Sequence, residues 1–376
     1  MSDYTEQTTC LFCDCDMLQP ILTTSYQIPL GCYVVPTSNH PGVSMPFQVM
    51  NCPMCHTHQL RYFGNPDIIY NYEANSHGSI RSSMNEVFSK FVTQDSSITS
   101  ILEIGAGHGD LADQILSINS NLSYTIIDPT YSGTENQRTI IRSFIEKIPK
   151  ESIHADTIVM SHVFEHFYKP NAILKLFQET PSIQTICLNM PDLDAYIQQG
   201  NYHVLNPEHI YYIEREFLMA LFEKHGFKTE MYSFHENHSV FYRFRRFTPI
   251  PNDTCLNPLK NIHATTQVSA FFEAIQTRIQ TIQTELDKHP ERPFYIWPCS
   301  MHTTYLLSLG LDPNRVTAIL DNAPHKIGQY LYGFQKECQA FSSVLKTTQP
   351  IFILLNGGCY NAEIQTSTQN PNITWL

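Results

Sequence analysis

Basic residues are scarce in this chain of 376 residues, and the first 60 contain neither lysine nor arginine. The whole chain carries 23 basic against 35 acidic residues, a formal net charge of −12. Nucleic acids and anionic membranes are bound through basic surfaces that neutralise phosphate groups. The composition therefore argues against a nucleic-acid binder and against attachment to an anionic membrane.

Long apolar runs are also missing. No stretch reaches the ~18 consecutive apolar residues of a membrane-spanning helix. The N-terminus, MSDYTEQTTC, has no basic region followed by an apolar one, so no secretory signal is predicted. Charged residues make up only 15% and hydrophobic residues 42% of the chain, which is typical of a folded protein with sizeable cores. We therefore expect a cytoplasmic protein of two or three domains.

Cysteine, in contrast, is abundant near the N-terminus: six of eleven cysteines fall in the first 55 residues, a proline-rich segment short of apolar core. Two CxxC pairs stand there, and each can place two thiolates on one tight turn. Two such turns complete a tetrahedral zinc site, which would stabilise the segment. We predict structural zinc, with buried free thiols as the alternative. The predicted ligands are Cys10, Cys13, Cys52 and Cys55, and the residues that could substitute for one of them are Cys15, Cys32, His56 and His58.

Strands and helices alternate after this segment. Short apolar runs at 101–104, 124–127, 157–160 and 186–188 predict strands, and helical spacing at 82–91 and 214–225 predicts helices. This order is typical of an α/β fold, a doubly wound parallel sheet with helices on both faces. An amphipathic pattern over 266–289 predicts a connecting helix, and a second alternation follows it. We therefore expect domains at 1–66, 67–245 and 246–376, the last with the connecting helix.

A glycine-rich turn stands between the first of these strands and a helix. It reads Glu103-Ile-Gly105-Ala-Gly107-His-Gly109-Asp110, and Asp128 ends the next strand. Alternate glycines let a ligand approach the backbone, and a strand-end acid can accept hydrogen bonds from ribose hydroxyls. No Lys-Ser/Thr pair follows, which excludes a P-loop. The alternative is a tight strand–helix turn that binds nothing.

The segment that starts at Asp156 predicts another strand, and Ser161 and His162 stand at its end. Ligands of open α/β sheets bind beyond the carboxyl ends of the strands. Ser161 and His162 are therefore expected beside the ligand. Glu165 and His166 follow in the sequence, and we interpret them as packing residues at a helix start rather than as the catalytic base.

At these residues the chain resembles class I S-adenosylmethionine (SAM)-dependent methyltransferases, whose central domain is Rossmann-like. Over nearly its whole length it resembles the three-part sugar C-methyltransferases, which have an N-terminal zinc-binding segment, a SAM domain and a C-terminal α/β domain. This resemblance also rests on the CxxC pairs, on Glu208-His209 and on the segment 321–333. It implies that Glu103, Gly105, Gly107 and Gly109 line the methionine moiety of SAM, that Asp128 holds the ribose, and that Ser161 and His162 lie near the donor.

The resemblance maps the family's catalytic Glu-His pair onto Glu208 and His209, with Tyr72 as a further contact near the reacting carbon. Carbon becomes nucleophilic once a proton α to a carbonyl is removed, and an imidazole with a pKa near ~6.5 can take that proton. The implied reaction is C-methylation of a nucleotide-linked keto-sugar through an enolate, by a monomer or homodimer. The alternatives are a helix-capping role for His209 and a packing role for Tyr72.

Two other functions compete with this hypothesis. One is an O- or N-methyltransferase that acts on another small molecule, with Glu208-His209 activating a hydroxyl or an amine. The other is a non-catalytic SAM-binding scaffold whose zinc segment docks a partner. A zinc-ribbon nucleic-acid binder is disfavoured because the first 60 residues lack basic side chains.

Overall fold

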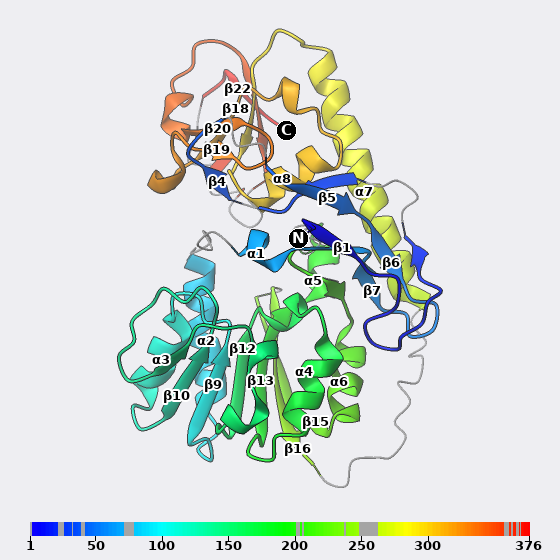
Figure 1. Cartoon of the computed structure of the whole chain (residues 1–376). Coiled ribbons are helices and arrows are strands. Elements are labelled where there is room, and N and C mark those ends of the chain that lie inside the picture. Colours follow the sequence, from blue (N-terminus) through cyan, green and yellow to red (C-terminus); the bar gives the residue numbers. More distant parts are fainter. Residues whose placement is uncertain are drawn as a thin grey trace.

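The computed structural model describes residues 2–21, 26–31, 33–38, 42–70, 79–200, 204, 207–236, 238–247, 262–356, 361, 364, 365, 368 and 370–376. Cys32, a predicted alternative zinc ligand, and Tyr72, a predicted substrate contact, lie outside the described residues. Two α/β bodies are visible, and the N-terminal segment runs along and between them (Figure 1). No helix in the described part of the chain is long and apolar enough to cross a membrane.

A seven-stranded sheet forms the core of the first body. Its strand order is β11-β10-β9-β12-β13-β16-β15, and the first five strands are parallel. The strands are β9 (Ser100–Ile104), β10 (Ser123–Ile127), β11 (Thr139–Ile141), β12 (Thr157–Ser161), β13 (Thr185–Pro191), β15 (Phe227–His235) and β16 (Ser239–Arg246).

The predicted parallel strands are confirmed, and an antiparallel hairpin that was not predicted extends the sheet at one edge. Strand β16 is antiparallel to both β13 and β15. A parallel neighbour needs a crossover of about a dozen residues or more, whereas three residues separate β15 from β16, so the two strands form a hairpin.

Helices cover both faces of this sheet because neighbouring strand residues point to opposite sides. Ile101 is buried with residues of α2 and α3, whereas Leu102 is buried in a second cluster that includes residues of α4 and α6. The prediction of helices on both faces is thereby confirmed. The helical elements of this body are α1 (Pro66–Ile69), α2 (Ser79–Thr93), α3 (Asp110–Ile118), α4 (Pro170–Gln178), α5 (Leu193–Gln198), α6 (Arg215–Lys224) and the 3-10 turns η1 (Ile145–Lys147), η2 (Lys150–Ser152) and η3 (Phe164–His166).

The second body follows α7 (Ile262–Asp287), which is the predicted connecting helix. Its sheet has the order β22-β21-β17-β18-β20-β19-β4. The elements are β17 (Phe294–Trp297), α8 (Met301–Ser308), η5 (Pro313–Arg315), β18 (Ala318–Asp321), η6 (Pro324–Lys326), β19 (Tyr330–Leu331), β20 (Lys336–Ala340), η7 (Phe341–Ser343), β21 (Ile351–Leu355) and β22 (Ile373–Trp375).

The N-terminal segment pairs with both bodies. Strand β4 (Val34–Val35) is an edge of the second sheet through β19, and β7 (His58–Leu60) pairs with β14 (Tyr211–Tyr212) of the first body. The other strands are β1 (Tyr4–Glu6), β2 (Gln19–Pro20), β3 (Tyr26–Pro29), β5 (Ser44–Phe47), β6 (Val49–Asn51) and β8 (Tyr62–Gly64).

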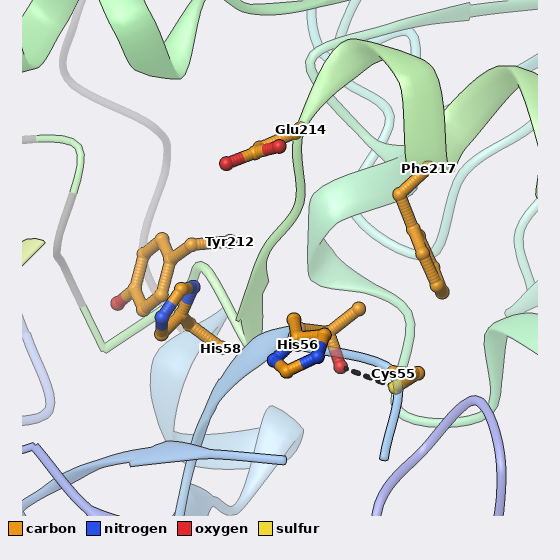
Figure 2. Close-up of a pocket in the computed structure, with 7 residues that line it drawn as sticks. Cys55, His56, His58, Tyr212, Glu214 and Phe217 are labelled. Atoms are coloured by element: carbon orange, nitrogen blue, oxygen red, sulfur yellow. Dashed lines mark hydrogen bonds between the residues drawn. The ribbon is translucent and has the colours of Figure 1, made fainter. Parts of the chain in front are cut away.

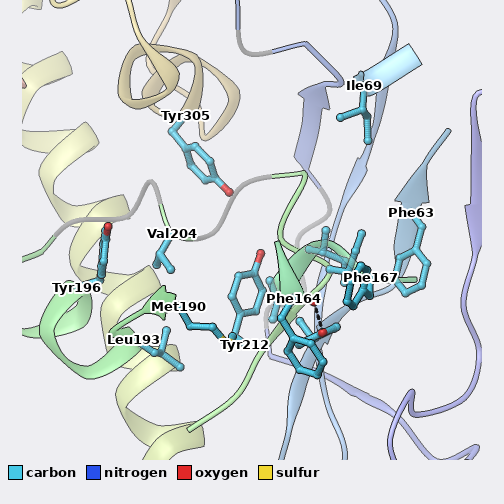
Figure 3. Packing of buried hydrophobic residues seen from close by; sticks show 14 of the residues in the cluster. Phe63, Ile69, Phe164, Phe167, Met190, Leu193, Tyr196, Val204, Tyr212 and Tyr305 are labelled. Atoms are coloured by element: carbon cyan, nitrogen blue, oxygen red, sulfur yellow. Dashed lines mark hydrogen bonds between the residues drawn. The ribbon is translucent and has the colours of Figure 1, made fainter. Parts of the chain in front are cut away.

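Aromatic packing reinforces these strand pairings. Phe12 makes edge-on contacts with Tyr211 and Phe217, at ring-centroid distances of 5.0 and 5.2 Å. On the other side of the segment, Phe47 contacts Tyr305 of α8 at 5.7 Å. One buried cluster therefore runs through all three parts of the chain, and Figure 3 shows a section of it.

Candidate active site

The glycine-rich turn after β9 has a backbone that favours glycine. Gly105, Gly107 and Gly109 have φ angles of +73°, +59° and +83°, a region that side chains with a Cβ rarely occupy. A Cβ on Gly105 would lie 2.4 Å from Cγ2 of Val163. Gly109 is the N-cap of α3, so the turn leads into the positive end of a helix. Packing against Val163 also requires glycine at position 105. The backbone of the turn is compatible with SAM, and its contact with SAM stays a prediction.

Asp128 follows β10 and fixes the shape of this turn. One carboxylate oxygen accepts a hydrogen bond from the backbone amide of Gly107 (2.8 Å), and the other accepts one from the amide of Thr130 (2.7 Å). A carboxylate can accept more than two hydrogen bonds, so ribose hydroxyls remain compatible with this arrangement. Glu103 is 2% exposed and accepts a hydrogen bond from the hydroxyl of Tyr124 (2.7 Å). The contacts of Asp128 and Glu103 with SAM stay predictions.

Ser161 ends β12, and His162 begins the loop beyond it, at the carboxyl edge of the sheet. The Ser161 hydroxyl accepts a hydrogen bond from the side-chain amide of Asn189 (3.0 Å). The ring of His162 lies between two polar groups, with Nε2 3.2 Å from the Ser239 hydroxyl and Nδ1 3.3 Å from Oε1 of Glu165. Both residues therefore stand at the predicted edge, and their contact with SAM stays a prediction.

The segment that carries Glu208 and His209 is docked onto η3. The backbone amide of Ile210 donates to the carbonyl of Glu165 (2.9 Å), and the Tyr211 hydroxyl donates to the carbonyl of Phe164. The loop before η3 is also the one that contacts the glycine turn, through Val163. These contacts place the Glu-His pair beside the glycine turn with η3 as the link.

The side chains of this region form a compact acid–imidazole cluster. His209 Nδ1 lies 2.6 Å from the carbonyl of Val204, and its Nε2 lies 3.9 Å from Oε1 of Glu165. The rings of His209 and His166 have centroids 5.1 Å apart. His166 Nδ1 lies 3.8 Å from Oε2 of Glu208. Because a carbonyl can only accept, Nδ1 of His209 carries a hydrogen, and the lone pair of the neutral ring is on Nε2.

Burial dominates the protonation of this cluster. Loss of solvent lowers the pKa of His166 to about 3 and raises the pKa of Glu208 to about 7. Burial also lowers the pKa of His209, and the negative charge of Glu165 opposes that shift. His166 and His209 are therefore neutral near pH 7, the state in which an imidazole can take a proton.

Two members of the cluster were not recognised from the sequence. Glu165 was interpreted as a packing residue, yet it is 2% exposed, and within the described part of the chain neither of its carboxylate oxygens has a hydrogen-bond partner. The hydroxyl of Tyr70 lies 2.9 Å from Nδ1 of His166, whereas the predicted Tyr72 lies outside the described residues. The only sequence feature that indicated a functional role for Glu165-His166 was their position just after a predicted strand. A packing role explains that position equally well.

The two CxxC turns come together as predicted from their spacing. The sulfur atoms of Cys10 and Cys55 are 3.5 Å apart, and so are those of Cys13 and Cys52. All four lie within 4.8 Å of one another. Tetrahedral Zn–S bonds of ~2.3 Å require sulfurs ~3.8 Å apart, so the donor set fits zinc. The neighbouring thiols of Cys52 and Cys55 lower the pKa of Cys10. Burial raises the pKa of Cys13, and the contact with Cys10 raises the pKa of Cys55.

The alternative ligands lie elsewhere in the described part of the chain. Cys15 accepts a hydrogen bond from the amide of Met17 and is not one of the four clustered cysteines. His56 and His58 line a small pocket between the second CxxC turn and α6, together with Tyr212, Glu214 and Phe217 (Figure 2).

The glycine turn at the end of β9 and the acid at the end of β10 are features that the sequence analysis expected of a SAM-dependent methyltransferase. A direct match supports this: residues 75–231, less than half of the chain, match the family model described as a methyltransferase domain. This stretch includes the glycine turn, Asp128 and the Glu208-His209 pair, but neither the cysteine cluster nor the second α/β body. The chain therefore contains a methyltransferase domain and is a SAM-dependent methyltransferase.

Solved structures similar to this chain share little of its sequence. The plantazolicin methyltransferase BpumL, in complex with a monoazolic desmethylPZN analog and SAH, is 14% identical with a TM-score of 0.34, over 45% of this chain and 84% of its own. The mitomycin 7-O-methyltransferase MmcR is 18% identical with a TM-score of 0.36, over 44% of this chain and 55% of its own. An O-methyltransferase family protein from Burkholderia thailandensis is 13% identical with a TM-score of 0.35, over 44% and 56%. No curated protein matches the sequence.

Proposed function

We propose that this methyltransferase transfers the methyl group of SAM to a carbon of a nucleotide-linked keto-sugar, and that His209 is the base that forms the enolate. One observation carries the proposal: His209 Nδ1 lies 2.6 Å from the Val204 carbonyl, while Nε2 faces the buried carboxylate of Glu165 at 3.9 Å. This arrangement fixes the tautomer that accepts a proton at Nε2 and provides a negative charge for the imidazolium that results.

When bound, SAM supplies an electrophilic methyl group on a sulfonium. In our proposal Gly105, Gly107 and Gly109 give it bare backbone, with Asp128 toward the ribose. His209 Nε2 takes the proton α to the substrate carbonyl, and the electron pair of that C–H bond moves into the enolate. Glu165 stabilises the charged ring of His209 until the proton leaves. Glu208, whose pKa burial raises to about 7, can donate a hydrogen bond to the enolate oxygen when protonated.

We also propose that Cys10, Cys13, Cys52 and Cys55 hold a structural zinc ion. Four thiolates leave no open position on the metal, so the ion would stabilise the fold without taking part in the reaction. Our proposed domain division remains 1–66, 67–245 and 246–376. Strand β4 shows why the first part need not fold alone, since it pairs with β19 of the third.

The test is deuterium exchange in the absence of SAM. The enzyme is incubated in D2O with a panel of nucleotide-linked keto-sugars, and exchange α to the carbonyl is followed by NMR. We expect exchange with the wild type and a loss of at least ~10²-fold in His209→Ala. The control is His154→Ala, an exposed imidazole. Methyl transfer from SAM without exchange in D2O would favour O- or N-methylation, and SAM binding with neither reaction would favour the scaffold.

A further inference from the structure

Glu165 lies at the centre of a second group of metal-ligating side chains, apart from the four cysteines. Ligand atoms of Glu165, His166 and His209 all lie within 4.8 Å of one another. The three residues come from η3 and from the segment before β14, which are held together by the amide of Ile210 and the hydroxyl of Tyr211. The distance between the donors therefore depends on backbone contacts and not only on side-chain rotamers.

The carboxylate of Glu165 lacks the partners that burial normally demands. Its side chain is 3% exposed, and neither oxygen has a hydrogen-bond partner among the described residues. Desolvating a carboxylate is costly unless a cation or hydrogen-bond donors replace water. In the described part of the chain, the ion-pair neighbours of Glu165 are His162 and His209, and no lysine or arginine is among them.

The histidines are oriented as metal ligands usually are. A ligating imidazole typically gives its other nitrogen to a carbonyl or another polar group, which fixes the ring. His209 does this through Nδ1 and the Val204 carbonyl, which leaves the Nε2 lone pair directed at a negative carboxylate. His166 is held by the Tyr70 hydroxyl at 2.9 Å. A lone pair and a carboxylate that face each other repel unless a proton or a metal ion lies between them.

We propose that Glu165, His166 and His209 bind a divalent transition-metal ion. Two imidazoles and one carboxylate favour borderline ions such as Zn²⁺, Co²⁺ or Fe²⁺ over Mg²⁺ and Ca²⁺, which prefer oxygen ligands. Three protein ligands leave positions open for water or a substrate oxygen, unlike the four-cysteine site.

The proposed metal site and the proposed base share one atom, Nε2 of His209, so this inference rests in part on the proposed function. If His209 Nε2 is the base, a bound ion occupies the lone pair that takes the proton, so the ion and the proton compete. Metal binding is measured without substrate, and its outcome is therefore independent of whether His209 is the base.

The experiment titrates Co²⁺ into the full-length chain after its four-cysteine site has been loaded with Zn²⁺. We expect one further equivalent to bind, with visible d–d bands and without thiolate charge-transfer bands. Glu165→Gln, which keeps the shape and removes the charge, should weaken binding by more than ~10²-fold, because losing a ligand costs more than losing an outer-shell partner. His166→Gln should do the same.

The matched controls are Glu151→Gln and His154→Gln, which remove an exposed carboxylate and an exposed imidazole. Both should bind Co²⁺ as the wild type does. The proposal is overturned if the zinc-loaded wild type takes up no further Co²⁺, or if Glu165→Gln and His166→Gln bind it unchanged. Added Co²⁺ should slow deuterium exchange. Faster exchange would overturn the competition at Nε2 and the assignment of His209 as base, and would leave the binding site intact.

Discussion

Nε2 of His209 and Oε1 of Glu165 face each other at 3.9 Å, in a part of the molecule where Glu165 has lost nearly all contact with solvent. The two residues come from segments that are distant in sequence, and the hydrogen bond between Ile210 and the backbone of Glu165 joins those segments. In the proposed mechanism this contact fixes the base and its counter-charge relative to each other before any substrate arrives, which is the preorganisation that acid–base catalysis needs.

Replacing Glu165 by Gln should lower kcat by up to ~10²-fold, because in the proposed mechanism the imidazolium formed on His209 loses its counter-charge. The KM for SAM should stay within a factor of ~2, since the glycine turn is untouched. Steady-state kinetics with excess weak chelator would measure both constants, and Glu151→Gln is the exposed control. A variant with unchanged kcat would remove Glu165 from the mechanism.

Gly105→Ala should weaken SAM binding and destabilise the fold by ~1–3 kcal/mol. The new Cβ would combine a φ of +73° with a contact of 2.4 Å to Val163. Gly328→Ala is the matched control, because Gly328 has a φ of +78° and no atom within 4 Å of its Cβ position. Calorimetric titration would measure the affinity for SAM, and urea unfolding would measure the stability. The difference in stability between the two variants gives the cost of the clash, because both share the backbone strain.

A second substitution should restore part of the stability lost in Gly105→Ala. Val163→Ala removes the Cγ2 atom that the added methyl group would meet. The double variant Gly105→Ala/Val163→Ala should regain part of the stability lost in Gly105→Ala. If Gly105→Ala and Gly328→Ala lost the same stability and both bound SAM normally, close packing at the glycine turn would have no role.

Removal of the proposed zinc should destabilise the whole chain rather than its first part alone. Cys10→Ser breaks a four-sulfur group in which every cysteine except Cys13 is buried, and the loss of a structural metal typically costs several kcal/mol (on the order of 10 in isolated zinc peptides). Thermal unfolding and metal analysis would measure the effect. Cys15→Ser is the control, because Cys15 is not in the cluster. Equal metal content in Cys10→Ser and the wild type would contradict the assignment.

His302 should make stability depend on pH. Burial lowers its pKa from 6.5 to about 4, with a smaller contribution from Arg278. The unfolded chain therefore binds a proton on His302 below about pH 6.5, whereas the folded chain binds it only below about pH 4. The free energy of unfolding consequently falls as the pH falls from 6.5 to 4. The full shift would correspond to ~3 kcal/mol, and partial solvent contact should reduce it to ~1–2 kcal/mol.

Urea unfolding at pH 7 and pH 4.5 would measure this dependence. His302→Gln should reduce its slope, because the other buried histidines still contribute, whereas His325→Gln, at an exposed position in η6, should leave it unchanged. Equal slopes in the wild type and His302→Gln would show that other groups are responsible.

Local sequence patterns predicted the elements with strong periodicity and the sites built from short motifs. Helix α7 and strands β9, β12 and β21 follow from apolar spacing. The glycine turn and the CxxC pairs could be recognised because each motif lies within a few consecutive residues. The β15–β16 hairpin was missed because β15 is largely exposed, so its apolar alternation is weak. The pairing of Glu165 with His209 depends on tertiary contacts between distant segments, which no local pattern encodes.

The pairing of β4 with β19 has a consequence for biosynthesis. Val34 and Val35 emerge from the ribosome almost 300 residues before their partners Tyr330 and Leu331. The edge of the second sheet therefore stays open while the intervening residues are made, and this non-local contact is expected to form late and slowly. Until then two valines and a bare strand edge are exposed, which is the interval in which nascent chains are most prone to aggregate.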